Sequence, residues 1–220
     1  MLQALLFDLD GTLTDTDKLH LQAMQQLLLE EGRVFTEAEF DAHVSGRANA
    51  DLCRYLFPDR SLAEHQMFAD RKEARFRALS PTLQPTAGLL RLLEHAEQTG
   101  IGMAVVTNAP RANAVHMLAA MGLGERFAHV LVAEELPRAK PDPLPYLSGL
   151  GCLQAHAGHA LAFEDSVPGV TAASRAGIFT VGLSTSQTPE ALLAAGAQLV
   201  VADFDDPQLW ALIERMQATD

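Results

Sequence analysis

The chain has 220 residues, of which 48% are hydrophobic and 20% are charged, a composition typical of a soluble globular protein. It carries 28 acidic residues against 16 lysines and arginines, and a formal net charge of -12 argues against a nucleic-acid partner. No apolar run reaches the roughly 20 residues of a membrane span, and the first residues contain no basic leader, so we expect a cytoplasmic chain without a membrane partner.

The first apolar run, residues 4–7, is followed by a long stretch with helical patterns only. Helices are predicted at 17–31, 37–43, 48–57 and 62–79. Two of them begin with capping boxes, formed by Thr36 with Glu39 and by Ser61 with Glu64. We therefore expect an all-helical insert, a cap domain over 15–85, within a core domain made of 1–14 and 86–220.

From residue 87 onwards, short apolar runs alternate with helical stretches. Strands are predicted at 101–106, 130–132, 160–163, 178–181 and 199–201, and helices at 87–100, 110–122, 168–177, 189–196 and 205–220. The runs are continuously apolar, as is typical of strands covered by helices on both faces. The predicted fold class is therefore α/β, a doubly wound parallel sheet with an inserted all-helical cap.

Two carboxylates, Asp8 and Asp10, directly follow the first predicted strand, and Gly11 turns the chain after them. In open α/β sheets, ligands bind outside the carboxyl ends of the strands. One carboxylate of such a pair can act as a nucleophile or metal ligand while the other acts as general acid and base. This division of labour suits phosphoryl transfer, in which the protein positions the phosphoryl group and neutralises its charge.

Later predicted strands end in further polar groups. Thr107 and Asn108 offer a hydroxyl and an amide, Lys140 lies in a proline-flanked loop, and Glu164 and Asp165 add two carboxylates. Each group alone could belong to a turn, a solvated surface or a helix cap. Because they follow successive strands of one sheet, we expect them to meet at one edge. With the first carboxylate pair, they offer the oxygen ligands that Mg²⁺ prefers.

These motifs, in this order, resemble the haloacid dehalogenase-like superfamily, in the subclass with a helical cap that includes phosphoglycolate phosphatase-like and β-phosphoglucomutase-like enzymes. The resemblance covers nearly the whole chain, including Gly169 after the last carboxylates. It implies that Asp8 is a nucleophile that forms an aspartyl-phosphate and that Asp10 is the general acid and base. It also implies catalytic roles for Thr107 and Lys140 and a Mg²⁺ site, with the metal ligands Asp8, Asp10, Glu164 and Asp165.

Substrate specificity is expected to come from the cap. The candidate substrate-binding residues are Asn108, Gly11, Thr16, His20, Gly46, Arg47 and Lys72, and Asp15, Arg71 and Arg111 are further candidates. Some of these have plainer interpretations. Arg47 and His20 could be surface residues, and Arg71 and Lys72 could be charges on an exposed helix face.

We predict a Mg²⁺-dependent phosphatase that acts on a small phosphorylated metabolite, a sugar phosphate or a phosphoglycolate-like ester, and we expect a monomer. The alternative is a β-phosphoglucomutase-like sugar phosphomutase, which Thr14-Asp15-Thr16 followed by His20, and Arg71-Lys72, resemble. Thr107-Asn108 and the position of Arg47 directly after Gly46 favour the phosphatase. A catalytically silent protein that binds a phosphorylated ligand or a protein partner is a third hypothesis, against which the intact carboxylates argue.

Overall fold

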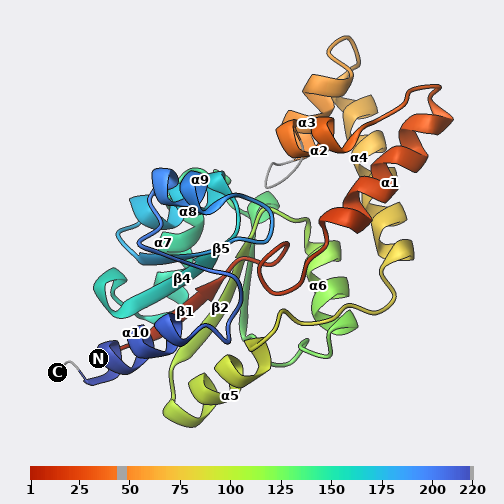
Figure 1. Cartoon of the computed structure of the whole chain (residues 1–220). Helices are drawn as coiled ribbons and strands as arrows, with labels where there is room; N and C mark the ends of the chain where they lie inside the picture. The colour runs from red at the N-terminus through yellow and green to blue at the C-terminus, as the bar shows by residue number, and fades with distance from the viewer. Residues whose placement is uncertain (44–48, 219–220) are drawn as a thin grey trace.

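A parallel sheet of six strands forms the centre of this computed structural model, which describes residues 1–43 and 49–218 (Figure 1). The order in the sheet is β3-β2-β1-β4-β5-β6, and every neighbouring pair is parallel. The strands are β1 Ala4–Phe7, β2 Gly102–Thr107, β3 His129–Val132, β4 Ala160–Glu164, β5 Phe179–Leu183 and β6 Leu199–Val201. This arrangement confirms the predicted fold class.

Helices cover both faces of the sheet (Figure 1). They are α5 Leu89–Thr99, α6 Arg111–Ala120, α7 Leu144–Leu153, α8 Val167–Arg175, α9 Pro189–Ala195 and α10 Pro207–Ala218, with short 3₁₀ helices at Ala133–Glu135 and Ala157–His159. Leu5 and Phe7 of β1 pack with α5, α6 and α10, whereas Ala4 and Leu6 pack with α7 and α8. Since alternate side chains enter two apolar layers, the strand has to be apolar throughout.

The helices that follow β1 form a lobe beside the sheet (Figure 1). They are α1 Asp17–Glu30, α2 Glu37–His43, α3 Asn49–Leu56 and α4 Leu62–Leu79. Both capping boxes are present, at Thr36 with Glu39 and at Ser61 with Glu64. The lobe has an apolar cluster of its own, made of residues between Met24 and Ala69. This separate cluster supports the proposed cap domain over 15–85.

Helix α7 was not predicted from the sequence. It contains Pro145, Gly149 and Gly151, which weaken a helical pattern. Gly149 is needed for close packing, because a Cβ at this position would lie 2.7 Å from Leu6 Cδ2 in β1. Helix α7 also brings the buried Tyr146 towards the end of β4.

Over residues 1–43 and 49–218, no helix is both long and apolar enough to cross a bilayer.

Candidate active site

Three adjacent strands deliver the predicted polar groups to one pocket. Asp8 follows β1, Thr107 ends β2, and Asp165 follows Glu164, the last residue of β4. These strands are neighbours in the order β2-β1-β4. The pocket is lined by Asp8, Asp10, Thr107, Asn108, Lys140 and Asp165 from the core and by His20 and Lys72 from the cap.

The ammonium group of Lys140 lies between two buried carboxylates. Its Nζ donates to Asp8 Oδ1 at 2.6 Å and to Glu164 Oε1 at 2.5 Å. Although burial opposes the charge, these two carboxylates raise the pKa of Lys140 to about 12. Asn108 fixes the lysine from behind: the Lys140 backbone N–H donates to Asn108 Oδ1 at 3.1 Å, and Asn108 Nδ2 donates back to the Lys140 carbonyl at 3.4 Å.

Glu164 is completely buried, and donors of the protein surround its carboxylate. Besides Lys140, Tyr146 donates its hydroxyl to Oε1 at 2.6 Å, and Ser166 donates to Oε2 at 3.1 Å. Gly169 leaves the space for this carboxylate, because a Cβ there would overlap it. The carboxylate therefore orients Lys140, and its predicted role as a metal ligand would compete with three protein donors.

Asp165 is held by a loop that the sequence did not single out. Ser186, after β5, donates its hydroxyl to Asp165 Oδ2 at 2.5 Å, and Thr12 Oγ1 lies 3.4 Å from Oδ1. Thr185 donates to the Gly11 carbonyl at 2.5 Å. Gly11 has a φ of 71°, and a side chain there would overlap Asp165. Gly11 thus lets the turn after β1 approach this carboxylate.

The charges of this cluster fit a divalent cation. Carboxylate oxygen atoms of Asp8, Glu164 and Asp165 lie within 4.8 Å of one another. Against these three carboxylates stands the ammonium group of Lys140, which contacts Asp8 and Glu164. The pKa of Asp8 is raised well above its usual range. Burial is the largest cause, repulsion from Glu164 adds to it, and the attraction of Lys140 offsets only part of the rise. Burial, followed by repulsion from Asp8 and Glu164, raises the pKa of Asp165. The carboxylate oxygens of Asp8 and Asp165, with the Glu164 carboxylate beside them, form a hard oxygen site that suits Mg²⁺.

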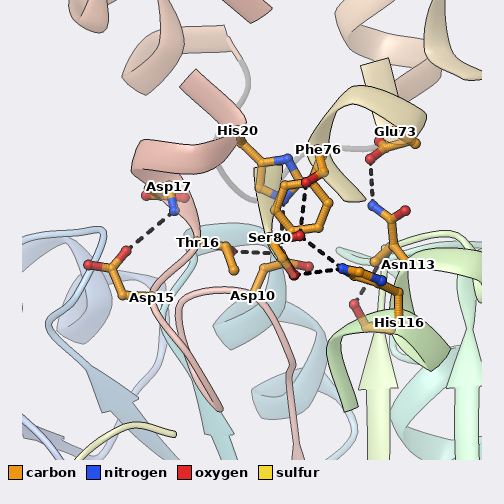
Figure 2. A network of polar contacts seen from close by, with 12 residues as sticks. Asp10, Asp15, Thr16, Asp17, His20, Glu73, Phe76, Ser80, Asn113 and His116 are labelled. Carbon is orange, nitrogen blue, oxygen red and sulfur yellow. Dashed lines mark hydrogen bonds and ion pairs between the residues drawn. The ribbon is translucent and has the colours of Figure 1, made fainter. Parts of the chain in front are cut away.

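The second carboxylate of the motif, Asp10, is bound by two residues at the start of the cap (Figure 2). Its Oδ1 lies 2.7 Å from the donating Thr16 hydroxyl and 3.0 Å from His20 Nε2. Burial would raise the pKa of Asp10, but the contacts with His20 and Thr16 outweigh burial and lower it. The imidazole of His20 stacks on Phe76 of α4, with 3.9 Å between ring centroids. Two cap helices therefore position this carboxylate.

The other predicted cap residues differ in where they lie. The interpretation of Lys72 as an exposed charge is wrong, because its side chain is buried and its Nζ donates to Glu73 Oε1 at 2.8 Å and to Asn49 Oδ1 at 3.2 Å. Three further candidates lie away from the catalytic pocket: Arg71 pairs with Glu30 and Glu31, Arg111 pairs with Glu135, and Asp15 accepts from the Asp17 N–H. Gly46 and Arg47 lie outside the described residues.

A polar bridge that the sequence did not reveal joins the cap to the core (Figure 2). Asn113 of α6 donates to Glu73 Oε2 at 2.5 Å and accepts from Arg77 Nη1 at 2.6 Å, so α6 holds two residues of α4. His116, three residues further along α6, contacts the Ser80 hydroxyl at 3.0 Å. Through Glu73, this bridge also fixes the position of Lys72 beside the pocket.

Replacing Glu73 should change the pH dependence of stability. Burial opposes ionisation of Glu73, but Lys72 and the hydrogen bonds around it lower the pKa to about 2 from an unfolded value of 4.5. A lowered pKa contributes stability that is complete above the unfolded value and is lost as the pH falls through the folded value. We expect Glu73→Gln to unfold at a lower temperature than the wild type at pH 7, and the difference to shrink from pH 4.5 towards pH 2. A difference in melting temperature that stays constant over this range would contradict the assignment.

An open parallel sheet with clustered carboxylates and a lysine at the ends of its middle strands, facing a helical cap, defines a class of capped α/β enzymes. The chain belongs to the haloacid dehalogenase-like hydrolases, since the sequence model of that family matches residues 5–183. It is therefore an enzyme of this family, as the motifs predicted.

Relatives of known activity and known structure extend this assignment. The chain is 30% identical to validoxylamine A 7'-phosphate phosphatase of Streptomyces hygroscopicus subsp. limoneus, covering 90% of this chain and 93% of that protein. It is 32% identical to β-phosphoglucomutase of Mycobacterium bovis, covering 92% and 90%. The crystal structure of CbbY from Rhodobacter sphaeroides in complex with phosphate superposes with a TM-score of 0.85 at 25% identity, covering 94% of this chain and 96% of that one.

Proposed function

We propose that this enzyme is a Mg²⁺-dependent phosphatase that hydrolyses the phosphate ester of a sugar or another small metabolite through an aspartyl-phosphate on Asp8. The observation that carries the proposal is the arrangement around Asp8, where the Lys140 ammonium lies 2.6 Å from the carboxylate and Asp10 lines the same pocket. A nucleophile, a fixed cation and a second carboxylate are the groups that phosphoryl transfer requires.

The proposed reaction has two displacement steps. A carboxylate oxygen of Asp8 attacks phosphorus, the ester P–O bond breaks, and Asp10 in its acid form gives its proton to the leaving oxygen. Asp10 then accepts a proton from a water molecule that attacks the aspartyl-phosphate, which releases phosphate, restores the carboxylate of Asp8 and returns Asp10 to its acid form. The lowered pKa of Asp10 favours the ionised form that this second step needs.

Other residues of the pocket would bind and neutralise the phosphoryl group. We assign Thr107 to a phosphoryl oxygen and Lys140 to the charge that develops on the oxygens. Mg²⁺, held by Asp8, the Asp10 carbonyl and Asp165, would supply further charge neutralisation. Asn108 would act by fixing Lys140, and Thr16 and His20 by fixing Asp10.

A sugar phosphomutase is the second candidate, which the 32% identity to a β-phosphoglucomutase supports. The two activities differ in whether the phosphoenzyme returns its phosphoryl group to a sugar or gives it to water. The test is phosphate release from phosphoglycolate, sugar phosphates and nucleoside monophosphates, with Mg²⁺ and with EDTA. We expect release that EDTA abolishes. Conversion of β-glucose 1-phosphate to glucose 6-phosphate, stimulated by glucose 1,6-bisphosphate and faster than phosphate release, would favour the mutase instead.

The contact between Ser186 and Asp165 predicts an effect on metal affinity. Partners that hydrogen-bond to a metal ligand orient it, and their loss typically costs about 10–100-fold in affinity or activity. We expect Ser186→Ala to weaken Mg²⁺ binding, measured by titration calorimetry without substrate, by about tenfold or more. Ser184→Ala is the matched control, because Ser184 lies in the same loop as Ser186 but its hydroxyl contacts the Val201 carbonyl of β6 instead of Asp165. Equal Mg²⁺ affinity in the two variants would refute the role of Ser186.

A further inference from the structure

A second hollow lies between the cap and the core and is larger than the catalytic pocket. Helices α3 and α4 form one wall, and the segments that follow β2 and β3 form the other. Its volume is about 620 Å³, against about 80 Å³ for the catalytic pocket. Small-molecule sites commonly have volumes of about 300–1,000 Å³, so this groove, unlike the catalytic pocket, has the size of a complete ligand site.

The groove and the catalytic pocket adjoin. Asn49 of α3 and Asn108 after β2 line both hollows. A substrate whose phosphoryl group lies at Asp8 can therefore extend past these two side chains into the groove. The small volume beside Asp8 leaves little other space for a bulky leaving group.

The walls of the groove suit a neutral, hydroxyl-rich occupant. The lining includes short apolar side chains, among them Ala50, Ala69 and Ala112, and hydrogen-bonding groups such as Gln66. Apolar patches of this kind can contact the C–H faces of a sugar ring, and the polar groups can bind its hydroxyls.

The charges of the groove disfavour a second anion. Of the described residues that line it, three carry carboxylates, Asp70, Glu73 and Glu134, and two carry guanidinium groups, Arg54 and Arg77. Arg54 pairs with Asp51, and Glu73 pairs with Lys72, so Asp70 and Glu134 remain against Arg77, which donates to Asn113. The surplus is thus negative, and a second phosphate would be repelled.

We propose that the groove binds the distal part of the leaving group and that the preferred substrate is a phosphorylated carbohydrate larger than one sugar ring, neutral apart from its phosphate. This proposal rests on the phosphatase function proposed above. It adds that binding energy from the distal ring contributes to turnover, because contacts remote from the reacting bond raise kcat/KM.

The test compares one-ring and two-ring esters on wild type and on a variant with a narrowed groove. Ala112 is exposed at the start of α6 and lines the groove, so Ala112→Phe fills space without disturbing the core. Val115→Phe is the matched control, since Val115 is 58% exposed on the same helix and is not among the described residues that line the groove. The substrates are glucose 6-phosphate and three disaccharide phosphates: trehalose 6-phosphate, sucrose 6-phosphate and maltose 6'-phosphate.

We expect the wild type to prefer at least one disaccharide phosphate over glucose 6-phosphate by about tenfold or more in kcat/KM. Ala112→Phe should remove this preference, and Val115→Phe should change neither the preference nor glucose 6-phosphate turnover. The proposal is overturned if no disaccharide phosphate is preferred, or if Ala112→Phe leaves a preference intact.

A binding measurement separates this proposal from the phosphatase function. Calorimetric titration of Asp8→Asn with the same esters should give tighter binding of a two-ring ester, and Ala112→Phe in that background should weaken it. Preferential binding without phosphate release from any ester in the wild type would sink the phosphatase function and keep the groove assignment. Phosphate release together with equal binding of all the esters would keep the phosphatase function and overturn the groove assignment.

Discussion

Asp8→Asn should lower phosphate release by about 10⁴-fold or more, because an amide cannot replace the carboxylate as the attacking nucleophile. The side chain keeps its size, and its oxygen can still accept from Lys140. The loss should therefore appear in kcat, measured at saturating substrate with Mg²⁺ present. Turnover within tenfold of the wild type would exclude Asp8 as the nucleophile.

The same variant should fold at least as stably as the wild type. Asp8 belongs to a cluster of three buried carboxylates whose oxygen atoms lie within 4.8 Å, and removing one charge relieves their mutual repulsion. Thermal unfolding in EDTA measures this directly. A lost activity with an unchanged or raised melting temperature separates catalysis from folding, whereas a strong destabilisation would contradict the charge surplus inferred from the structure.

Lys140→Met should abolish activity and also destabilise the protein, by about 3–5 kcal/mol, the usual cost of leaving a buried charge without its partner. The ammonium group is buried and contacts both Asp8 and Glu164, and methionine retains the length of the side chain without the charge. Chemical denaturation in the absence of Mg²⁺ gives the free energy of unfolding. Because a bound divalent cation would replace part of the lost positive charge, we expect the destabilisation to be smaller when Mg²⁺ is added.

A double variant shows whether the cost comes from the unpaired charge. In the Lys140→Met variant, Asp8 and Glu164 are both left without their cation. Adding Glu164→Gln removes one of these two charges and keeps an acceptor for the Tyr146 hydroxyl. It should recover a large part of the stability and none of the activity. If the second substitution adds to the destabilisation of the first, packing rather than charge determines the loss.

The sheet and most of its helices could be predicted because their signals are local. Continuous apolar runs located all six strands, and capping boxes located the starts of two cap helices. Helix α7 was missed because its glycines oppose helix formation, and the reason for Gly149, its close approach to Leu6, appears only in the folded structure. Here tertiary packing overrides local propensity.

The residues of the site likewise divide into those that local sequence signals predict and those that only the fold brings together. Asp8, Thr107, Lys140 and Asp165 could be placed together because parallel strands end at one edge of a sheet. The contacts of Ser186 with Asp165 and of Asn113 with Glu73 join segments far apart in the chain, and neither residue lies in a recognisable motif. For Lys72, the sequence showed a charged stretch of helix, whereas its burial depends on the fold of the whole cap.

The position of β1 in the sheet sets an order for folding during synthesis. This strand is made before its partners β2 and β4, which begin only at Gly102 and Ala160, after the helical lobe. The apolar cluster of the lobe, between Met24 and Ala69, can assemble while β1 still lacks both neighbours. A nascent chain of this enzyme therefore carries a fully apolar central strand that has no partner until β2 has been made and only one partner until β4 has been made, and this interval is when it should depend most on chaperones.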